Sequence, residues 1–456
     1  MKSINPHTGR VIEEFKPLSN EELIQKIERS WEAFQSHRKS DINVRKEKFL
    51  KLSKVLLENA PKYAEVITSE MGKPYQESIA EVQKAAKHCE YCANNLEMFL
   101  AEEHVPTDAK KSFVEYQPIG PVFFIAPFNF PFWLVFKGAA PALAVGNTIL
   151  SKVASSCPRT GMCVEEAFKL AGFDQGEFQF LLTTQEQSEI IIGHKYVRGV
   201  SFTGSTKGGS TIASLAGKYC KKSIMELGGS DPLVVMKDAD LDIAVNVAVS
   251  SRLRNAGQVC SCAKRFIIDE SVYDEFVSKL IEKVKSVKIG DPMKKDTKLG
   301  PLAAKRVLEG VQHQLKEGLK AGGKLLYGGE KPDLEELKNG YYFIPAIVEV
   351  DEKNPLVQEE TFGPIFALLK YRTEEEALRL ANNTQYGLGS IVISKDEERA
   401  LQFGRNIEAG ALFINNLTKS DSKMPSGGVK ESGYGRECGV HGAREFTNVK
   451  TVWVGK

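Results

Sequence analysis

Cysteine is scarce in this chain, and 8 residues in 456 are too few for a scaffold held together by disulfides. An excess of one charge is also missing, because 61 Lys and Arg residues stand against 59 Asp and Glu residues, which argues against nucleic acid as a partner. Residues 1–10 contain no apolar stretch of the kind found in secretory signals. Together these absences predict a cytoplasmic protein with reduced cysteines.

Long uninterrupted hydrophobic runs are absent as well. The most apolar stretch, residues 121–150, is broken by Asn129, Lys137 and several glycines and prolines. Since a membrane span needs roughly 20 predominantly apolar residues, this stretch is expected to be buried core, and no membrane partner is predicted. Cys89 and Cys92 form a C-x-x-C pair, but no second pair follows at a zinc-binding spacing, so helical thiols are favoured and no metal is predicted.

Helical and strand-like segments alternate along the chain, which predicts an α/β fold. Helical spacing of apolar residues occurs at residues 44–60 and 271–288. Short apolar runs typical of buried parallel strands lie at residues 122–126, 148–152, 199–203, 233–236, 265–268 and 412–414. The alternation occurs once before Glu226 and again after Cys260, so we expect two doubly wound domains, a Rossmann-like cofactor domain and a catalytic domain, with a cleft between them.

The expected division of the chain also includes a small β oligomerisation element. Extended segments at residues 113–117 and 451–454 have edges that could pair with another subunit, which predicts a homodimer or a homotetramer. The dinucleotide-binding domain is expected at residues 1–103 and 119–227. The catalytic domain is expected at residues 228–425, and the oligomerisation strands at residues 104–118 and 440–456.

Three segments carry side chains suited to covalent chemistry. Cys260 lies among small and polar residues in G-Q-V-C-S-C, as an accessible nucleophile requires. Glu226, in M-E-L-G-G, is flanked by apolar residues, and burial of a carboxyl group raises its pKa toward that of a useful base. Asn129, in P-F-N-F-P, has an amide that could donate to an oxyanion. Taken separately, a structural thiol, a salt-bridged glutamate and a turn asparagine are the favoured interpretations.

A fourth segment suits phosphate binding. Gly204 and Ser205 follow the expected strand 199–203 in the pattern G-S-x-x-G, which leads into a helix. Glycine lets the backbone approach a phosphate, and a helix N-terminus attracts an anion. The usual fingerprint is G-x-G-x-x-G, so this incomplete match is a weak signal by itself.

The four segments together, in this order, resemble the aldehyde dehydrogenase superfamily. The resemblance covers nearly the whole chain, from I-N-P-H-T-G at residues 4–9 to S-G-Y-G-R at residues 432–436. It is strongest to the short bacterial succinate-semialdehyde dehydrogenases, which share G-G-S-D-P at residues 228–232 and K-R-F-I-I at residues 264–268. The resemblance implies an NAD(P)-dependent enzyme and overrides the separate structural interpretations of the three segments.

By this resemblance, the Cys260 thiolate attacks the aldehyde carbon, and the Asn129 amide and the Cys260 N–H hold the oxyanion. Hydride transfer to the nicotinamide then leaves a thioester, which water activated by Glu226 hydrolyses. Glu226 disfavours a CoA-acylating enzyme, the complete trio disfavours a non-catalytic nucleotide-binding protein, and the lack of a histidine partner motif disfavours a thiol protease. Cys262 lies close enough in sequence for a reversible disulfide with Cys260 to be a hypothesis.

The resemblance also assigns the cofactor contacts. It implies that a lysine reaches the adenosine ribose, a glycine and a serine contact the pyrophosphate, a glutamate holds the nicotinamide ribose, and aromatic rings line that pocket. The corresponding residues here are Lys152, Gly204, Ser205, Glu360, Phe362 and Phe128. At Ser155, NAD-preferring relatives often carry a glutamate that would repel a 2′-phosphate, so we predict that NADP is accepted and preferred, with NAD as the alternative.

Two cations bias the substrate prediction. Succinate-semialdehyde dehydrogenases often carry arginines where Arg254 and Lys137 lie, and a cation is what a distal carboxylate requires. Structural salt bridges are the competing interpretation, equally favoured for Lys137. Phe132 and Trp133 are expected to line the substrate tunnel, and Ser420 to add a hydroxyl from a covering loop. The predicted substrate is succinate semialdehyde, with another small aliphatic or aromatic aldehyde as the alternative.

Overall fold

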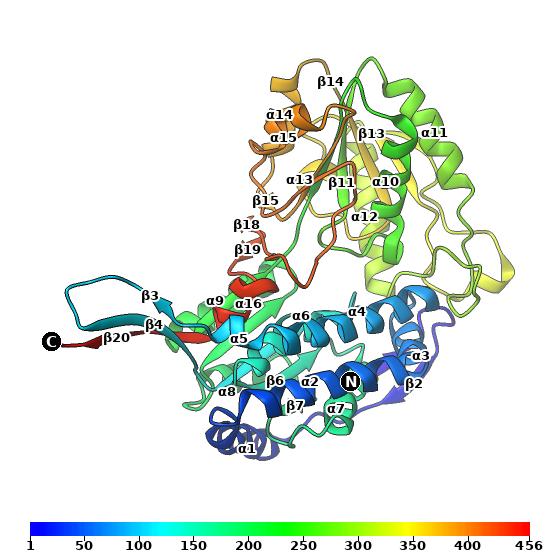
Figure 1. Ribbon diagram of the computed structural model, residues 1–456. Coiled ribbons are helices and arrows are strands. Elements are labelled where there is room, and N and C mark those ends of the chain that lie inside the picture. Colours follow the sequence, from blue (N-terminus) through cyan, green and yellow to red (C-terminus); the bar gives the residue numbers. More distant parts are fainter.

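Two sheets of mostly parallel strands organise the chain in the computed structural model, which describes all 456 residues (Figure 1). The first sheet has the strand order β19-β9-β8-β5-β6-β7, and only β19 is antiparallel to its neighbour. Its strands are β5 (Pro121–Ala126), β6 (Thr148–Val153), β7 (Phe178–Phe180), β8 (Gly199–Thr203), β9 (Lys222–Glu226) and β19 (Gly433–Tyr434).

The second sheet has the strand order β12-β13-β14-β11-β10-β16-β17, and only the edge strand β12 is antiparallel. Its strands are β10 (Asp231–Val235), β11 (Ala263–Asp269), β12 (Lys324–Tyr327), β13 (Ala346–Glu349), β14 (Ile365–Tyr371), β16 (Ser390–Ile393) and β17 (Leu412–Ile414). The predicted α/β class with two doubly wound units is therefore confirmed. Two of the six predicted strands have the expected bounds, and the others differ by one or two residues at their ends.

Helices pack against both sheets (Figure 1). Those associated with the first sheet are α1 (Asn20–His37), α2 (Ile42–Glu58), α3 (Ala60–Met71), α4 (Tyr75–Asn94), α5 (Leu96–Leu100), α6 (Trp133–Ala144), α7 (Pro158–Leu170), α8 (Gln187–Gly193), α9 (Thr206–Lys218) and α16 (Gly439–Glu445). Those of the second are α10 (Leu241–Leu253), α11 (Tyr273–Lys285), α12 (Lys305–Lys320), α13 (Pro355–Gln358), α14 (Glu374–Asn382) and α15 (Glu397–Gly404). Two separate clusters, of 47 and 46 buried hydrophobic residues, give each sheet its own core. No helix is long and apolar enough to cross a membrane.

Local sequence explains where several of these elements begin and end. Ser19 caps α1 in a reciprocal capping box with Glu22, which satisfies two otherwise free backbone donors. In α11, Tyr273, Phe276 and Leu280 recur at intervals of three and four residues, so their side chains share the buried face. In the first sheet, β5 is a nearly continuous apolar run and every residue of β6 is buried, as expected where both faces of a parallel sheet are covered.

The strand order determines where a ligand can bind. In the first sheet, β6 and β7 lie on one side of β5, and β8 and β9 lie on the other. The strand order therefore reverses between β5 and β8, and such a switch point leaves a crevice beyond the carboxyl ends of the strands. The loop after β5 contains Asn129, and the loop after β8 contains Gly204 and Ser205. Cys260 lies just before β11, at the amino edge of the second sheet. The two edges therefore bring the predicted functional segments toward one cleft.

A third, three-stranded sheet projects from the body and ends at the C-terminus (Figure 1). It consists of β3 (Glu103–His104), β4 (Lys111–Pro118) and β20 (Thr447–Val454), which contain the two segments predicted to be extended. Shorter pairs are formed by β1 (Lys2–Ile4) with β2 (Val11–Glu14) and by β15 (Tyr386–Gly387) with β18 (Val429–Lys430).

Candidate active site

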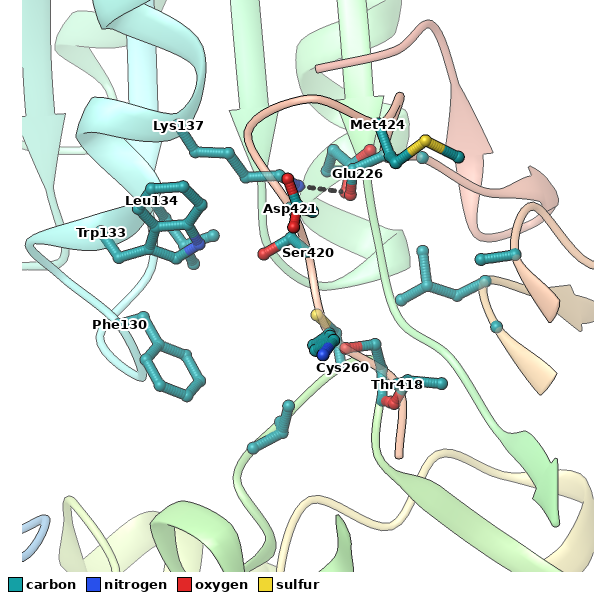
Figure 2. A pocket seen from close by; sticks show the side chains of 18 of the residues that line it. Phe130, Trp133, Leu134, Lys137, Glu226, Cys260, Thr418, Ser420, Asp421 and Met424 are labelled. Atoms are coloured by element: carbon teal, nitrogen blue, oxygen red, sulfur yellow. Dashed lines mark hydrogen bonds and ion pairs between the residues drawn. The ribbon is translucent and has the colours of Figure 1, made fainter. Parts of the chain in front are cut away.

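A cavity of about 630 Å³ lies between the two sheets and is lined by both Cys260 and Glu226 (Figure 2). One wall comes from α4, α6 and the end of β9, and the opposite wall comes from the Cys260 loop and the segments that precede β16 and β17. A loop that contains Ser420 and Asp421 covers it. The tertiary structure therefore brings together a nucleophile and a carboxylate that are separated along the chain.

The backbone before Cys260 has an unusual conformation. Asn255, Ala256 and Gly257 have φ values of 51°, 52° and 76°, three consecutive residues in the left-handed region. This region disfavours any residue with a Cβ, and at Gly257 a Cβ would lie 2.5 Å from the carbonyl carbon of Gly363. Such strained backbone persists only where surrounding contacts hold it, and it is characteristic of functional sites.

Cys260 itself is half-buried, and burial raises the pKa of its thiol to about 11, although the charges of Lys264 and Lys137 act in the opposite direction. The thiol is therefore protonated at neutral pH in the resting site, and a base must remove its proton. Lys264 Nζ donates to the carbonyl oxygens of Val259 at 3.0 Å and Cys260 at 2.7 Å, so this buried cation holds the nucleophile loop. Nothing in the K-R-F-I-I segment indicates this role for Lys264, because it depends on contacts with the preceding loop.

Asn129 is brought against the same loop. Its side chain is 2% exposed, and its Nδ2 donates to the carbonyl oxygen of Gln258 at 3.0 Å. In return, Asn255 Nδ2 donates to the carbonyl oxygen of Asn129 at 2.8 Å. The side-chain amide of Asn129 has a second N–H group, and Cys260 lies two residues after Gln258, the residue that accepts from the first. The Asn129 side chain is therefore fixed against the loop that carries Cys260.

Glu226 lies at the end of β9 and points toward Lys137 (Figure 2). Lys137 Nζ donates to Glu226 Oε2 at 3.2 Å and forms a second ion pair with Glu437 at 3.0 Å, whereas Glu226 Oε1 has no hydrogen-bond partner. Burial alone would lower the pKa of Lys137, but the two carboxylates outweigh it and hold the pKa well above its usual range. Burial raises the pKa of Glu437, which also accepts a hydrogen bond from Ser201 Oγ at 3.3 Å.

These ion pairs correct one expectation of the sequence analysis. Lys137 was predicted to bind a substrate carboxylate, with a structural salt bridge as the competing interpretation. Lys137 does line the cavity, but its charge is already matched by two buried carboxylates. The structure therefore favours the salt bridge, and the sequence offered no signal for the partner Glu437, which lies far along the chain.

The residues assigned to the adenosine end lie at the carboxyl edge of the first sheet. Lys152 is buried near the end of β6, its Nζ donates to the carbonyl oxygen of Thr183, and burial lowers its pKa to about 8. Ser155 is exposed just beyond that strand. Ser205 caps α9, with its Oγ accepting from the N–H of Gly208 at 3.2 Å. An ammonium group, hydroxyls and a helix N-terminus form a donor set that fits a phosphorylated ribose and a pyrophosphate.

The residues assigned to the nicotinamide end come from both sides of the cleft. Phe128, after β5, meets Phe362 edge to face with ring centres 5.9 Å apart. Glu360 Oε1 accepts from the N–H of Gly229 at 3.1 Å and lies 3.4 Å from Lys264 Nζ. Glu360 is thus positioned by the same lysine that holds the nucleophile loop. The expected nicotinamide residues thus contact one another and the segment that carries Lys264.

The predicted substrate residues separate into two groups. Trp133, Arg254 and Ser420 line the cavity, as expected. Phe132 does not, because its side chain is 0% exposed and packs against Tyr63 in the first core. Consecutive residues at the start of a helix point about 100° apart, so Trp133 faces the cavity while Phe132 faces the interior. The prediction of a tunnel role for Phe132 is wrong.

The sequence analysis also missed Lys84 and Phe130, which line the cavity near Trp133. Helical spacing could have indicated Lys84. It lies three residues after Glu81 and seven after Glu77 on α4, so the three side chains share one face of the helix, and all three line the cavity.

The remaining cysteine expectations concern thiols that are free in this structure. Cys262 is buried, and its sulfur accepts from Arg252 Nη1 at 3.0 Å. A disulfide between Cys262 and Cys260 therefore stays a prediction that requires this contact to break. Cys89 and Cys92 are buried on α4.

Comparison with known proteins identifies what this site is similar to. The sequence model of the aldehyde dehydrogenase family matches residues 1–452. The chain is 40% identical to a probable NADP-dependent succinate-semialdehyde dehydrogenase of Synechocystis sp., over 99% of both chains. The structure is similar to succinic semialdehyde dehydrogenase from Streptococcus pyogenes in complex with NADP+, with a TM-score of 0.97, 36% identity and 100% coverage of both chains. It is also similar to a betaine aldehyde dehydrogenase variant from Staphylococcus aureus, with a TM-score of 0.96, 30% identity, and 99% of this chain and 91% of that chain covered.

Proposed function

Because the chain belongs to the aldehyde dehydrogenase family, we propose that it oxidises succinate semialdehyde to succinate, with NADP as the preferred hydride acceptor and NAD as the alternative. One observation carries the choice of substrate: the cavity that exposes Cys260 is also lined by Arg254, which has no ion-pair partner within 4.0 Å. A carboxylate at the far end of a short aldehyde would supply that partner, and a guanidinium binds carboxylates in a bidentate fashion.

The residues of the chain account for the chemistry in two stages. Glu226 takes the proton of the Cys260 thiol and passes it to solvent, and Sγ then bonds to the aldehyde carbon while the C=O π electrons move to the oxygen. The Asn129 amide and the Cys260 N–H stabilise the resulting oxyanion. Departure of a hydride from that carbon leaves a thioester on Cys260. Glu226 rotates away from Lys137 and takes a proton from water, the water oxygen bonds to the thioester carbon, and the C–S bond breaks to release the acid and restore the cysteine.

The dinucleotide, when bound, supplies the acceptor for the hydride. Lys152, Ser155 and the capped N-terminus of α9 would hold its phosphorylated end, and Glu360 its nicotinamide ribose. Ser155 carries no charge that would repel a 2′-phosphate, which supports the preference for NADP. The names of the relatives from Synechocystis sp. and Streptococcus pyogenes, which both specify NADP, support the same preference.

Two further proposals concern the context of the enzyme. The projecting sheet exposes Val449 by 59% and Trp453 by 54%, and large apolar side chains on an open sheet favour pairing with a second copy. We therefore propose a homodimer or a homotetramer. A cytoplasmic location is proposed from the scarcity of cysteine.

A kinetic panel tests the proposed function. Purified enzyme is assayed with succinate semialdehyde and with butanal, a neutral aldehyde of the same chain length, each with NADP and with NAD. We expect kcat/KM for succinate semialdehyde to exceed that for butanal by roughly tenfold or more, because butanal has no distal carboxylate to accept a hydrogen bond from a cation, which typically contributes about 1.5–3 kcal/mol. Cys260→Ala serves as the inactive control. Equal rates on both aldehydes would reject the carboxylated substrate, and a kcat/KM for NAD far above that for NADP would reject the cofactor preference.

A further inference from the structure

Four cations line the cavity, and only two of them lie within it without a carboxylate partner. Lys137 is paired with two glutamates, and Lys419 is exposed. Lys84 and Arg254 are partly buried, and neither forms an ion pair within 4.0 Å. Lys84 was not among the predicted site residues, and the side chains around it explain why its charge is uncompensated.

The nearest acidic group on the same helix is already engaged. Glu81 forms an ion pair with Lys73 and also accepts hydrogen bonds from the backbone N–H groups of Phe132 and Trp133, each at 2.9 Å. A carboxylate with these contacts has little capacity left for a second lysine. The charge of Lys84 is therefore available to an incoming group.

Two neutral contacts orient Lys84 toward the cavity. Its Nζ donates to Ser420 Oγ at 2.7 Å and lies 4.3 Å from the centre of the Trp133 ring. Both contacts come from residues that line the same cavity, and Figure 2 shows Trp133 and Ser420 facing each other across it. Since Ser420 Oγ accepts from Lys84, its own O–H is free to donate, so the pair presents an ammonium and a hydroxyl to one ligand.

We propose that Lys84, together with Ser420, is a specificity-determining residue that binds the distal carboxylate of the substrate. This inference rests on the proposed function and names the lysine that performs the recognition. Arg254 approaches the same region from the Cys260 loop, so the carboxylate lies between cations from both domains. Lys137, although it occupies the position that the sequence favoured, serves Glu226 instead.

The charge state of Lys84 adds a dependence on pH. Burial lowers its pKa to about 8, Arg254 and Lys137 act in the same direction, and Glu81 and Cys438 act against them. The other charged groups that face the cavity here are Glu77, Lys419 and Asp421. A substrate carboxylate is ionised throughout the neutral range, so the contribution of Lys84 to recognition is present below pH 8 and is lost as the pH rises and Lys84 becomes neutral, whereas Arg254 stays charged.

The test compares Lys84→Met, Lys84→Arg and a matched surface control on the same helix, Lys87→Met, with succinate semialdehyde and butanal. We expect Lys84→Met to lower the ratio of the two kcat/KM values roughly tenfold or more, because it removes one charge-assisted hydrogen bond to the carboxylate. Lys84→Arg should retain most of the ratio, because it keeps that hydrogen bond. Lys87 is exposed outside the cavity, so its variant keeps the wild-type ratio.

A second measurement follows the same kcat/KM ratio as a function of pH and uses only the wild-type enzyme and Lys84→Arg. The kcat/KM ratio of the wild-type enzyme should fall as the pH rises from 7 to 9, and in Lys84→Arg it should stay level, because arginine remains charged. Titration of Cys260 affects both aldehydes and cancels in the ratio. A wild-type enzyme that prefers succinate semialdehyde, with an unchanged ratio in Lys84→Met, would overturn this proposal alone. A wild-type enzyme without any preference would overturn it together with the proposed substrate.

Discussion

Lys137 and Lys84 line the same cavity but have opposite surroundings. Lys137 lies between Glu226 and Glu437, with its side chain 5% exposed, and its ammonium group forms ion pairs with both side chains. Lys84 has a hydroxyl and an indole as neighbours and no ion-pair partner. The difference teaches that the groups around a cation, more than its place in a sequence motif, determine whether it can bind a substrate.

The largest effect is expected when the Lys137 pair is broken. Replacing Lys137 with methionine leaves Glu226 and Glu437 buried without a counterion, which typically costs about 3–5 kcal/mol. Denaturation by urea should show a loss of this size, and kcat should fall for succinate semialdehyde and butanal alike, because the proposed general base Glu226 loses its ion-pair partner. The double variant Lys137→Met with Glu437→Gln should recover part of the stability.

The comparison would break if Lys137→Met kept its stability and its activity on butanal but lost activity on succinate semialdehyde alone. That result would return the carboxylate-binding role to Lys137.

A smaller and more selective effect is expected at Arg254. Arg254→Ala removes one of the two unpaired cations, so kcat/KM for succinate semialdehyde should fall by roughly tenfold to a hundredfold, the range of a hydrogen bond between charged groups. The value for butanal should change much less, because a neutral aldehyde has no carboxylate to lose contact. Steady-state kinetics with both aldehydes measure this difference. A parallel fall for both would indicate that Arg254 supports the Cys260 loop instead of the substrate.

The smallest effect is expected at Ser420. Ser420→Ala removes a neutral hydroxyl but leaves the charge of Lys84, and a neutral hydrogen bond typically contributes about 0.5–1.5 kcal/mol. Initial-rate measurements should show that KM for succinate semialdehyde rises by roughly two- to tenfold with little change in kcat. A loss as large as that of Lys84→Met would mean that the hydroxyl positions Lys84 as well as binding the carboxylate.

Much of the fold could be predicted because its signal is local. Alternating apolar strands and helices indicated two parallel sheets, and the predicted runs at residues 199–203 and 412–414 have the bounds found in β8 and β17. The boundaries of β10 and β11 differed, since β10 begins with a buried aspartate and proline that do not look like strand residues. Tertiary packing overrides local propensity at such ends.

The site was predictable to the extent that its chemistry lies in short segments. Cys260, Glu226 and Asn129 each sit in a compact motif, and the structure brings Cys260 and Glu226 to one cavity and Asn129 to the Cys260 loop. Phe132 was predicted to line the substrate tunnel, but it is buried in the core. Neighbouring residues at the start of a helix point in different directions, and the sequence does not show which of Phe132 and Trp133 faces the cavity.

The sequence alone determined the order of the strands and helices along the chain and indicated the candidate nucleophile Cys260 and the candidate base Glu226, because these signals depend on neighbouring residues. Only the tertiary structure decided which cations are free, because charge compensation depends on groups distant in sequence. Glu437 meets Lys137 through the C-terminal segment, and Ser420 meets Lys84 through a loop that closes over the cavity. Folding therefore commits Lys137 to Glu226 and leaves Lys84 available for a ligand.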